Sequence, residues 1–294
     1  MGKAGAMACL WTIARLTLRE GMRRRLLLAL GGLSLVGVLF TAWGYAELPN
    51  LPGARGETRL ATDQMRLIAS QLLILVMFMF SFVLALAAVF AAAPSVAGEL
   101  ESGEMLAVLA RPIPRRSVLL GKWLALAIVV VVYALAATAL EFGAALLTTG
   151  YHPPHPIEAS LYVAGEGLVT LALAMALSTR VPPVTAGIVA MLLFGIAWVG
   201  GVVGGIGSAF SDPLVGQLGT VTRILLPTDG LWRGAIFSLE PAQMVLAGAA
   251  AGPQIAAFPF YASAPPPFVY VAWSVIWVVG MLAIAVVSFE RRDL

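Results

Sequence analysis

The sequence predicts an all-α integral membrane protein with six transmembrane helices, cytoplasmic N- and C-termini and an amphipathic N-terminal interfacial helix. Three observations predict this fold class. Hydrophobic residues make up 60% of the 294 residues and charged residues only 11%, against roughly 25% charged residues in a soluble domain. The mean hydropathy is +0.94. The apolar residues form six long runs, and the basic residues gather at the ends of these runs.

Each apolar run is long enough to cross about 30 Å of hydrocarbon as a helix that rises about 1.5 Å per residue, the first and fourth only just. A helix is the expected form, because lipid offers the backbone no hydrogen-bond partner. The predicted spans are residues 26–43, 68–93, 118–148, 161–178, 184–206 and 269–288.

The basic residues set the predicted orientation, because cytoplasmic loops carry an excess of Lys and Arg. Thirteen of the 18 basic residues fall on the side of both termini. The other five fall on the outer side: Arg55, Arg59, Arg66, Arg223 and Arg233. The sequence therefore places both termini in the cytoplasm, which requires an even number of spans. The net charge of +3 is explained by topology and does not predict a nucleic-acid partner.

Residues 1–25 are predicted to form an amphipathic helix before the six-helix domain of residues 26–294. Its apolar residues recur at helical spacing, and its arginines line a neighbouring flank. The apolar residues are Met7, Leu10, Trp11, Ala14 and Leu18, and the arginines are Arg15, Arg19 and Arg23. We expect this helix to lie on the inner membrane surface. A basic anchor that only fixes topology is the alternative.

A long outer segment, residues 207–268, precedes the last span. Its residues 242–258 are apolar but rich in Ala and Gly, and Pro253 and Gln254 interrupt them. If they crossed the membrane, Arg291 and Arg292 would lie outside. We therefore expect an interfacial or re-entrant piece, and the sequence does not decide between the two.

Polar and small residues inside the predicted spans are the candidate intramembrane sites. Glu141 and Glu166 lie within the third and fourth spans, where an ionisable group costs a few kcal/mol and is a functional candidate by default. The alternative is that both reach the lipid headgroups. In the fifth span, close helix packing is predicted by two overlapping Gly-x-x-x-Gly pairs, either within one subunit or between subunits. These pairs are Gly200, Gly201, Gly204 and Gly205.

The loop of residues 94–117, between the second and third spans, is the most polar stretch of the chain. Glu99, Glu101 and Glu104 begin it, and Arg115 and Arg116 end it. If residues 98–109 form one helix, the acids are favoured at its N-terminus. Acids that project from a cytoplasmic loop can also pair with basic groups on a partner. We expect the two arginines to stay near the anionic inner leaflet.

This loop resembles that of the ABC-2 type permeases, the membrane subunits of one class of ATP-binding-cassette transporter. The resemblance rests on Gly98-Glu99, Gly103-Glu104-Met105, Pro112-Ile113-Pro114-Arg115 and Gly121-Lys122. Glu104 departs from the Thr or Ser that is usual there. "TIARLTLREGMRRRLLL" is similar to the N-terminal helix of the family. "LLPTDGLWRGAIF" resembles an outer segment of permeases similar to the nitrous-oxide-reductase maturation subunit. Pro227, Asp229 and Arg233 match this segment, whereas Leu226 replaces an Asn.

The resemblance implies a multi-pass protein of the prokaryotic inner membrane that pairs as a homodimer on two cytoplasmic ATPase subunits. ATP and Mg²⁺ are then expected on the ATPase, with no cofactor, metal or catalytic residue on this chain. The implied ATPase-coupling residues are Glu99, Glu101, Gly103, Glu104, Pro112 and Arg115. Membrane lipid and an extracytoplasmic protein are the other expected partners.

The predicted function is a permease subunit that couples ATP hydrolysis by the separate ATPase to export of a lipophilic substrate. The apolar spans carry no cluster of charge, which favours such a cargo. Two alternatives stay open. The subunit could relay ATPase motion to an outer protein without transport, or it could be a secondary transporter that uses Glu141 and Glu166.

Overall fold

The computed structural model describes residues 3–23, 25–51, 61–105, 113–252, 255 and 258–292, with backbone only for the helical residues among 3–6 and 20–30. These residues form helices and loops and contain no strand, so the predicted all-α class is confirmed. The long helices are α1 (Lys3–Arg23), α2 (Arg25–Glu47), α3 (Thr62–Ala93), α6 (Arg115–Thr149), α7 (Pro156–Ser178), α8 (Pro183–Ala209) and α13 (Phe268–Glu290). The shorter ones are η1 (Leu48–Asn50), η2 (Pro94–Gly98), α4 (Glu99–Glu101), α9 (Pro213–Leu225), α10 (Thr228–Leu239) and α11 (Ala242–Ala250).

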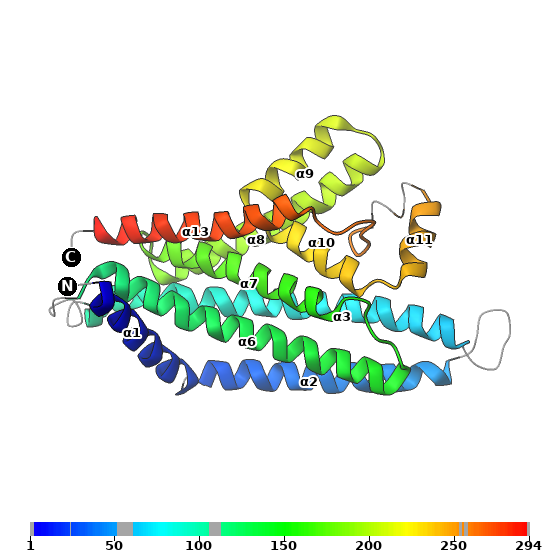
Figure 1. Cartoon of the computed structure of the whole chain (residues 1–294), viewed down its shortest axis with the longest axis horizontal. Helices are drawn as coiled ribbons and strands as arrows, with labels where there is room; N and C mark the ends of the chain where they lie inside the picture. Colours follow the sequence, from blue (N-terminus) through cyan, green and yellow to red (C-terminus); the bar gives the residue numbers. More distant parts are fainter. Residues whose placement is uncertain are drawn as a thin grey trace.

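Six of the long helices, α2, α3, α6, α7, α8 and α13, run along the length of the molecule, and both termini lie at the same end (Figure 1). Five described helices are long and apolar enough to cross a membrane: α3 with its extension to Glu101, α6, α7, α8 and α13. The helix α2, with 23 residues, covers the first predicted span. The bounds agree with the predicted spans, whereas the count of six crossings and the orientation stay predictions.

Helix α7 is the central helix of the bundle. In its most apolar window, 72% of the residues are buried, compared with 22% in α13 and 33% in α6 and α8. Small side chains such as Ala164, Ala172 and Ala174 are fully or almost fully enclosed. Because these residues leave room for close approach, neighbouring helices can pack around α7 without a hydrophobic drive from water.

The N-terminal helix α1 packs against α6 at Gly121. A Cβ atom added at Gly121 would lie 2.9 Å from the Leu10 carbonyl oxygen and from the Ile13 side chain, so only glycine permits this crossing. Ala14 is buried in the same contact, whereas Trp11 is exposed. Helix α1 covers the residues of the predicted N-terminal helix, and an amphipathic helix on the membrane surface stays a prediction.

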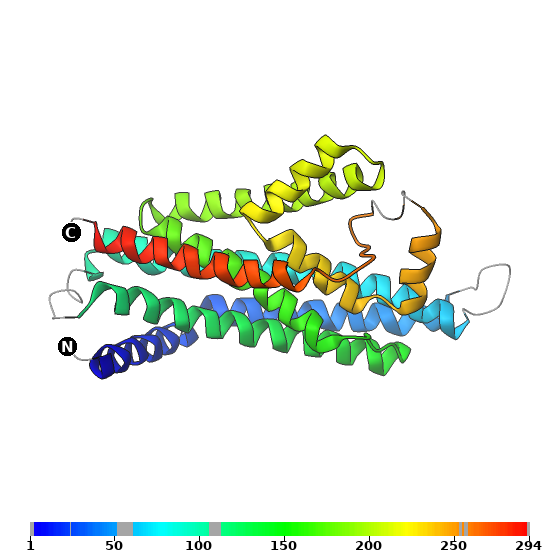
Figure 2. The same ribbon diagram turned by 45° about the horizontal axis from the view of Figure 1, so that its top comes forward.

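Within its described residues, the outer segment contains the short helices α9, α10 and α11. Helix α9 turns back beside the end of α8, and the hairpin that they form there projects from the bundle in both views (Figures 1 and 2). Helix α10 is buried against α7. Helix α11 has 9 residues and, at about 14 Å, is too short to cross a membrane. Of residues 242–258, Pro253, Gln254 and their neighbours 256–257 lie outside the described residues.

Candidate functional site

The candidate coupling loop begins as a continuation of α3. Pro94 has no N–H to donate to the preceding turn, and the helix widens there into the π-helical turn η2, as expected where a proline interrupts the hydrogen-bond ladder. One short turn, α4, follows. It ends at Gly103, whose φ is +79°. Since this left-handed conformation ends a helix, a single helix over residues 98–109 is wrong. Pro112 and residues 106–111 lie outside the described part.

Glu99 is held inside the chain rather than presented to a partner. Its carboxylate pairs with Lys122 of α6, and the Lys122 ammonium also donates to the Ser95 carbonyl at 2.8 Å. Lys122 is only 6% exposed. A buried ammonium needs a carboxylate as its counter-ion, so Glu99 is already engaged within the chain, and its role in coupling stays a prediction.

Glu101 and Glu104 are the acids of this loop that face solvent. Both side chains are exposed, and Gly103 lies between them at the turn. Met105, the next residue, is completely buried in a cluster with Leu119 and Phe289. The loop is thus anchored at Met105 while its two acids remain accessible.

Arg115 caps the last turn of α13. Its Nη1 donates to the carbonyl oxygens of Arg292 at 2.7 Å and Glu290 at 3.3 Å. In turn, Nη1 of Arg292 donates to the Thr179 carbonyl at the end of α7, at 2.8 Å. Cations are favoured at helix C-termini, where carbonyl groups lack partners. Arg115 therefore joins α6 to α13, and its expected position near the inner leaflet stays a prediction.

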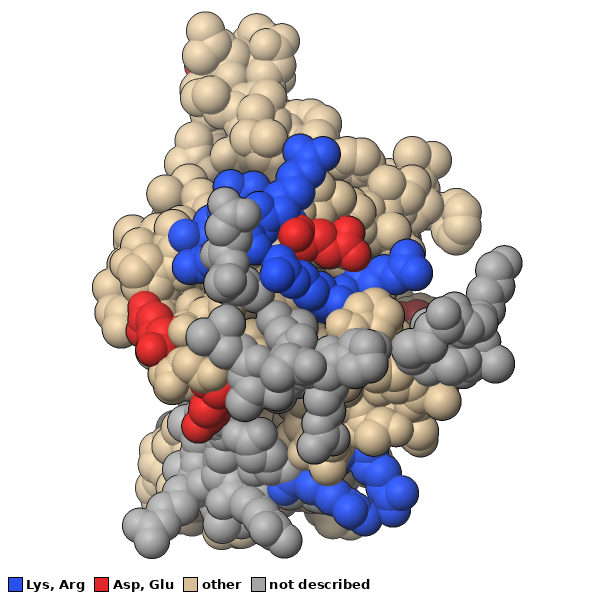
Figure 3. Space-filling view, turned by 90° about the vertical axis from the view of Figure 1, so that its left-hand side faces the viewer, with Lys and Arg blue, Asp and Glu red and all other residues tan. Residues whose placement is uncertain are grey.

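These contacts lie at the end of the bundle that carries both termini. Figure 3 views this end: Lys and Arg side chains gather on it, with acidic side chains between and beside them. We name this surface the polar end and define it by Glu101, Glu104, Arg115, Arg116, Arg180, Glu290, Arg291 and Arg292, side chains that are exposed or partly exposed.

The two intramembrane acids face the protein interior. Glu141 is 0% exposed and accepts a hydrogen bond from Thr41 Oγ1 of α2 at 2.7 Å. Glu166 is 4% exposed and accepts from the Ser81 hydroxyl of α3. The alternative that they reach the headgroups is therefore wrong. Each carboxyl instead links two helices.

A buried ion cluster joins α8, α9 and α10. Asp229, at the start of α10, is 2% exposed, and its Oδ2 accepts from Arg223 Nε at 2.7 Å and Arg233 Nε at 3.2 Å. Both arginines also donate from Nη2 to the Gly201 carbonyl, at 3.2 and 3.1 Å. Arg223 and Arg233 are thus partners of Asp229 rather than free outer-loop charges. The sequence assignment missed this pairing, although Asp229 and Arg233 are four residues apart on one helix.

The four glycines of the fifth span contact this cluster and α9 of the same chain. A Cβ atom at Gly201 would lie 2.0 Å from Asp229 Cγ, and one at Gly204 would lie 2.3 Å from Gly219 Cα. Gly200 faces Thr222, and Gly205 faces Arg233. The structure thus places these glycines in contacts within one subunit.

A further buried acid, Glu240, lies between α10 and α11. It is 2% exposed, and its Oε2 accepts from the Ala262 backbone N–H at 3.3 Å. Its Oε1 is buried without a hydrogen-bond partner in the described part of the chain. Burial raises the pKa of Glu240 from 4.5 to about 8, although the Ala262 N–H acts in the opposite direction. The ionised form is therefore disfavoured in the folded protein.

This raised pKa predicts a pH-dependent stability. Between about pH 4.5 and 8 the folded protein keeps a proton on Glu240 that the unfolded chain has released. The contribution of protonated Glu240 to the free energy of unfolding is therefore complete below this pH range and is lost as pH rises through it. Glu240→Gln keeps an acceptor for Ala262 and removes the ionisation. We expect wild-type protein to lose more thermal stability than Glu240→Gln between pH 6 and pH 9. Parallel losses in the two proteins would contradict this role.

Comparisons with known proteins agree with this geometry. The profile of the ABC-2 family transporter proteins matches residues 11–294. The chain is also 31% identical over 191 residues to the probable ABC transporter permease protein NosY of Pseudomonas aeruginosa. That match covers 59% of this chain and 61% of the relative, so less than two thirds of the relative's length is spanned. Since the family profile covers nearly the whole chain, the protein belongs to the ABC-2 family of transporter proteins.

Proposed function

We propose that this multi-pass protein is the permease subunit of an ABC transporter that couples ATP hydrolysis by a separate cytoplasmic ATPase to export of a lipophilic substrate. The observation that carries the proposal is the arrangement of the polar end. Glu101 and Glu104 are exposed on a loop. The residues on either side of them, Glu99 and Met105, contact the long helices. If a bound partner displaces such a loop, the displacement is transmitted to the helices.

Side-chain contacts connect this loop to three helices, α6, α7 and α13. Lys122 holds Glu99 and the Ser95 carbonyl, which ties the loop to α6. Met105 packs against Phe289 of α13. Beyond them, Arg115 joins α6 to α13, and Arg292 joins the end of α13 to α7. Because helices are stiff, a displacement of the loop moves all three elements together.

An apolar groove supports a lipophilic cargo. It has a volume of about 580 Å³ and lies between α7 and α13, with Trp123 of α6 and Leu231 of α10 at its sides. Most of its lining is aliphatic or aromatic, including Leu168 and Val275, with Glu158, Gly165 and Ser274 as the other lining residues. A substrate that enters such a groove loses little by leaving lipid, whereas a charged substrate would have to give up its hydration.

A homodimer on two ATPase subunits is part of this proposal, with ATP and Mg²⁺ on the ATPase. The family membership favours it over the secondary transporter, in which Glu141 and Glu166 would move ions. An extracytoplasmic partner that receives the motion remains compatible with the same coupling route.

Charge reversal at the exposed acids tests the coupling. We expect Glu101→Lys combined with Glu104→Lys to insert and fold normally, because both side chains are exposed. The partner ATPase should co-purify at least about tenfold less, since removing close interfacial charge pairs costs several kcal/mol. The measurement is the ATPase recovered with affinity-purified permease, together with its ATP hydrolysis.

The matched control is Glu47→Lys, an exposed acid at the opposite end of α2. It should leave ATPase recovery unchanged. Full recovery and full transport in the double variant would remove Glu101 and Glu104 from the coupling surface.

A further inference from the structure

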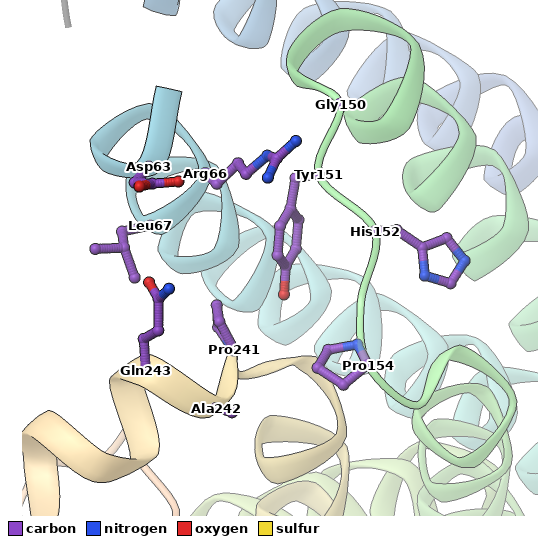
Figure 4. A pocket seen from close by; sticks show the side chains of 10 residues that line it. All are labelled: Asp63, Arg66, Leu67, Gly150, Tyr151, His152, Pro154, Pro241, Ala242 and Gln243. Atoms are coloured by element: carbon purple, nitrogen blue, oxygen red, sulfur yellow. The ribbon is translucent and has the colours of Figure 1, made fainter. Parts of the chain in front are cut away.

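A polar pocket opens at the outer end of the bundle. It has a volume of about 450 Å³ and lies between the start of α3, the chain after α6 and the start of α11 (Figure 4). Arg66 reaches from α3 towards the chain at Gly150, with Asp63 one turn away, whereas the ring of His152 points away from the other side chains. We name this the headgroup pocket.

The headgroup pocket presents one unpaired carboxylate and one unpaired guanidinium. Asp63 and Arg66 are both exposed. Within the described residues, neither forms an ion pair or a side-chain hydrogen bond, with the other or with a third residue. Two opposite charges that do not pair with each other leave two separate binding positions, one for an anionic group and one for a cationic group.

A second, apolar pocket lies further along α11. It has a volume of about 330 Å³ and is lined by side chains such as Ala247, Ile255 and Phe258. Met244 also lines this pocket, and Gln71 Nε2 of α3 donates to its sulfur at 2.8 Å, which joins α11 to α3. We name this the acyl pocket.

The two pockets are stacked in the order that a phospholipid requires. Asp63, Leu67 and Gln71 follow each other at four-residue spacing on α3; the first two line the headgroup pocket and Gln71 lines the acyl pocket. Eight residues of helix correspond to about 12 Å. The predicted second span begins at residue 68, so the headgroup pocket lies just outside the predicted hydrocarbon and the acyl pocket just within it.

We propose that the two pockets together bind one zwitterionic glycerophospholipid whose headgroup carries a phosphate and a primary ammonium group. The phosphate is held by Arg66, because guanidinium binds phosphate oxygens through several N–H groups. The ammonium is held by Asp63, and an acyl chain fills the acyl pocket. An anionic lipid without the ammonium would meet the Asp63 carboxylate unpaired. The proposal needs the predicted membrane placement of the outer end but not the coupling of ATP hydrolysis.

Native mass spectrometry of the full-length protein in detergent tests the site, with phosphatidylethanolamine, phosphatidylcholine and phosphatidylglycerol added singly. We expect phosphatidylethanolamine to bind most tightly, since its primary ammonium donates to Asp63. Arg66→Gln and Asp63→Asn should each weaken this binding roughly tenfold, the effect of losing about 1.4 kcal/mol. Arg19→Gln and Glu47→Gln, exposed residues outside both pockets, should leave it unchanged.

Two further experiments distinguish binding of a whole lipid from binding of its headgroup alone. Ala247→Trp should fill the acyl pocket and weaken lipid binding without touching Asp63 or Arg66. Water-soluble glycerophosphoethanolamine should compete only weakly, because it lacks acyl chains. Equal binding of all three lipids, or competition by the soluble headgroup as strong as by the lipid, would overturn the proposal. ATPase recovery with the Arg66→Gln variant reports separately on coupling and should match wild type.

Discussion

Replacing Asp229 with alanine is expected to lower the free energy of unfolding by about 3–5 kcal/mol, the cost of breaking a buried ion pair from one side. Asp229 is 2% exposed and is bound by both Arg223 and Arg233. Without the carboxylate, two guanidinium groups would remain against the Gly201 carbonyl as uncompensated charges. Thermal unfolding in detergent, followed by the yield of monodisperse protein, measures the loss.

Asp212→Ala is the matched control for this substitution. Asp212 caps α9, where its Oδ1 accepts from the backbone N–H groups of Leu214 and Val215. It lies at the exposed tip of the α8–α9 hairpin, so its loss should cost only about 0.5–2 kcal/mol. A loss for Asp229→Ala no larger than that for Asp212→Ala would contradict the role assigned to the ion cluster in joining α8, α9 and α10.

Gly204→Ala in α8 is expected to be strongly destabilising. The new Cβ atom would lie 2.3 Å from Gly219 Cα and 2.9 Å from Gly219 N. Because these are backbone atoms, no side-chain rotation relieves the clash, and α9 must move away. Overpacking of this kind costs about 1–3 kcal/mol or more. Reduced thermal stability and a lower yield of folded protein are the expected results.

Gly195→Ala tests whether this effect is specific. A Cβ atom at Gly195, also in α8, meets nothing within 4 Å. Alanine there should stabilise the helix by up to about 1 kcal/mol. If both substitutions had the same effect, the close approach of α8 and α9 would not be what Gly204 provides.

The spans were predictable because their signal is local. An apolar run of sufficient length must become a helix in lipid, whichever helices surround it. The Gly-x-x-x-Gly pairs of α8 were visible for the same reason. The residues that these glycines contact, Gly219 and Asp229, could not be predicted. Only the turn between α8 and α9 brings them back to α8, and no spacing in the sequence encodes that turn.

The charged residues were harder to assign because a charge does not reveal its partner. Glu99 and Glu101 are two residues apart and were predicted to act together. In the structure, Glu99 pairs with Lys122 on α6, 23 positions away, and Glu101 is exposed. Gly121 and Lys122 were noted as a motif, yet their roles, contact with α1 and pairing with Glu99, depend on tertiary contacts. Likewise, the contacts of Arg115 with the end of α13 were not predicted, because they depend on tertiary structure.

Photocrosslinking from position 104 is the most direct test of the proposal that the polar end docks an ATPase. A photoreactive phenylalanine analogue would replace Glu104 in cells that express this chain with its partner subunits, and position 47 would serve as the control. The account predicts that position 104 forms an adduct with a cytoplasmic ATP-binding-cassette ATPase, and that ATP changes the yield of this adduct. It predicts no such adduct from position 47. Equal adduct yields from the two positions, or none from position 104 while transport continues, would contradict it.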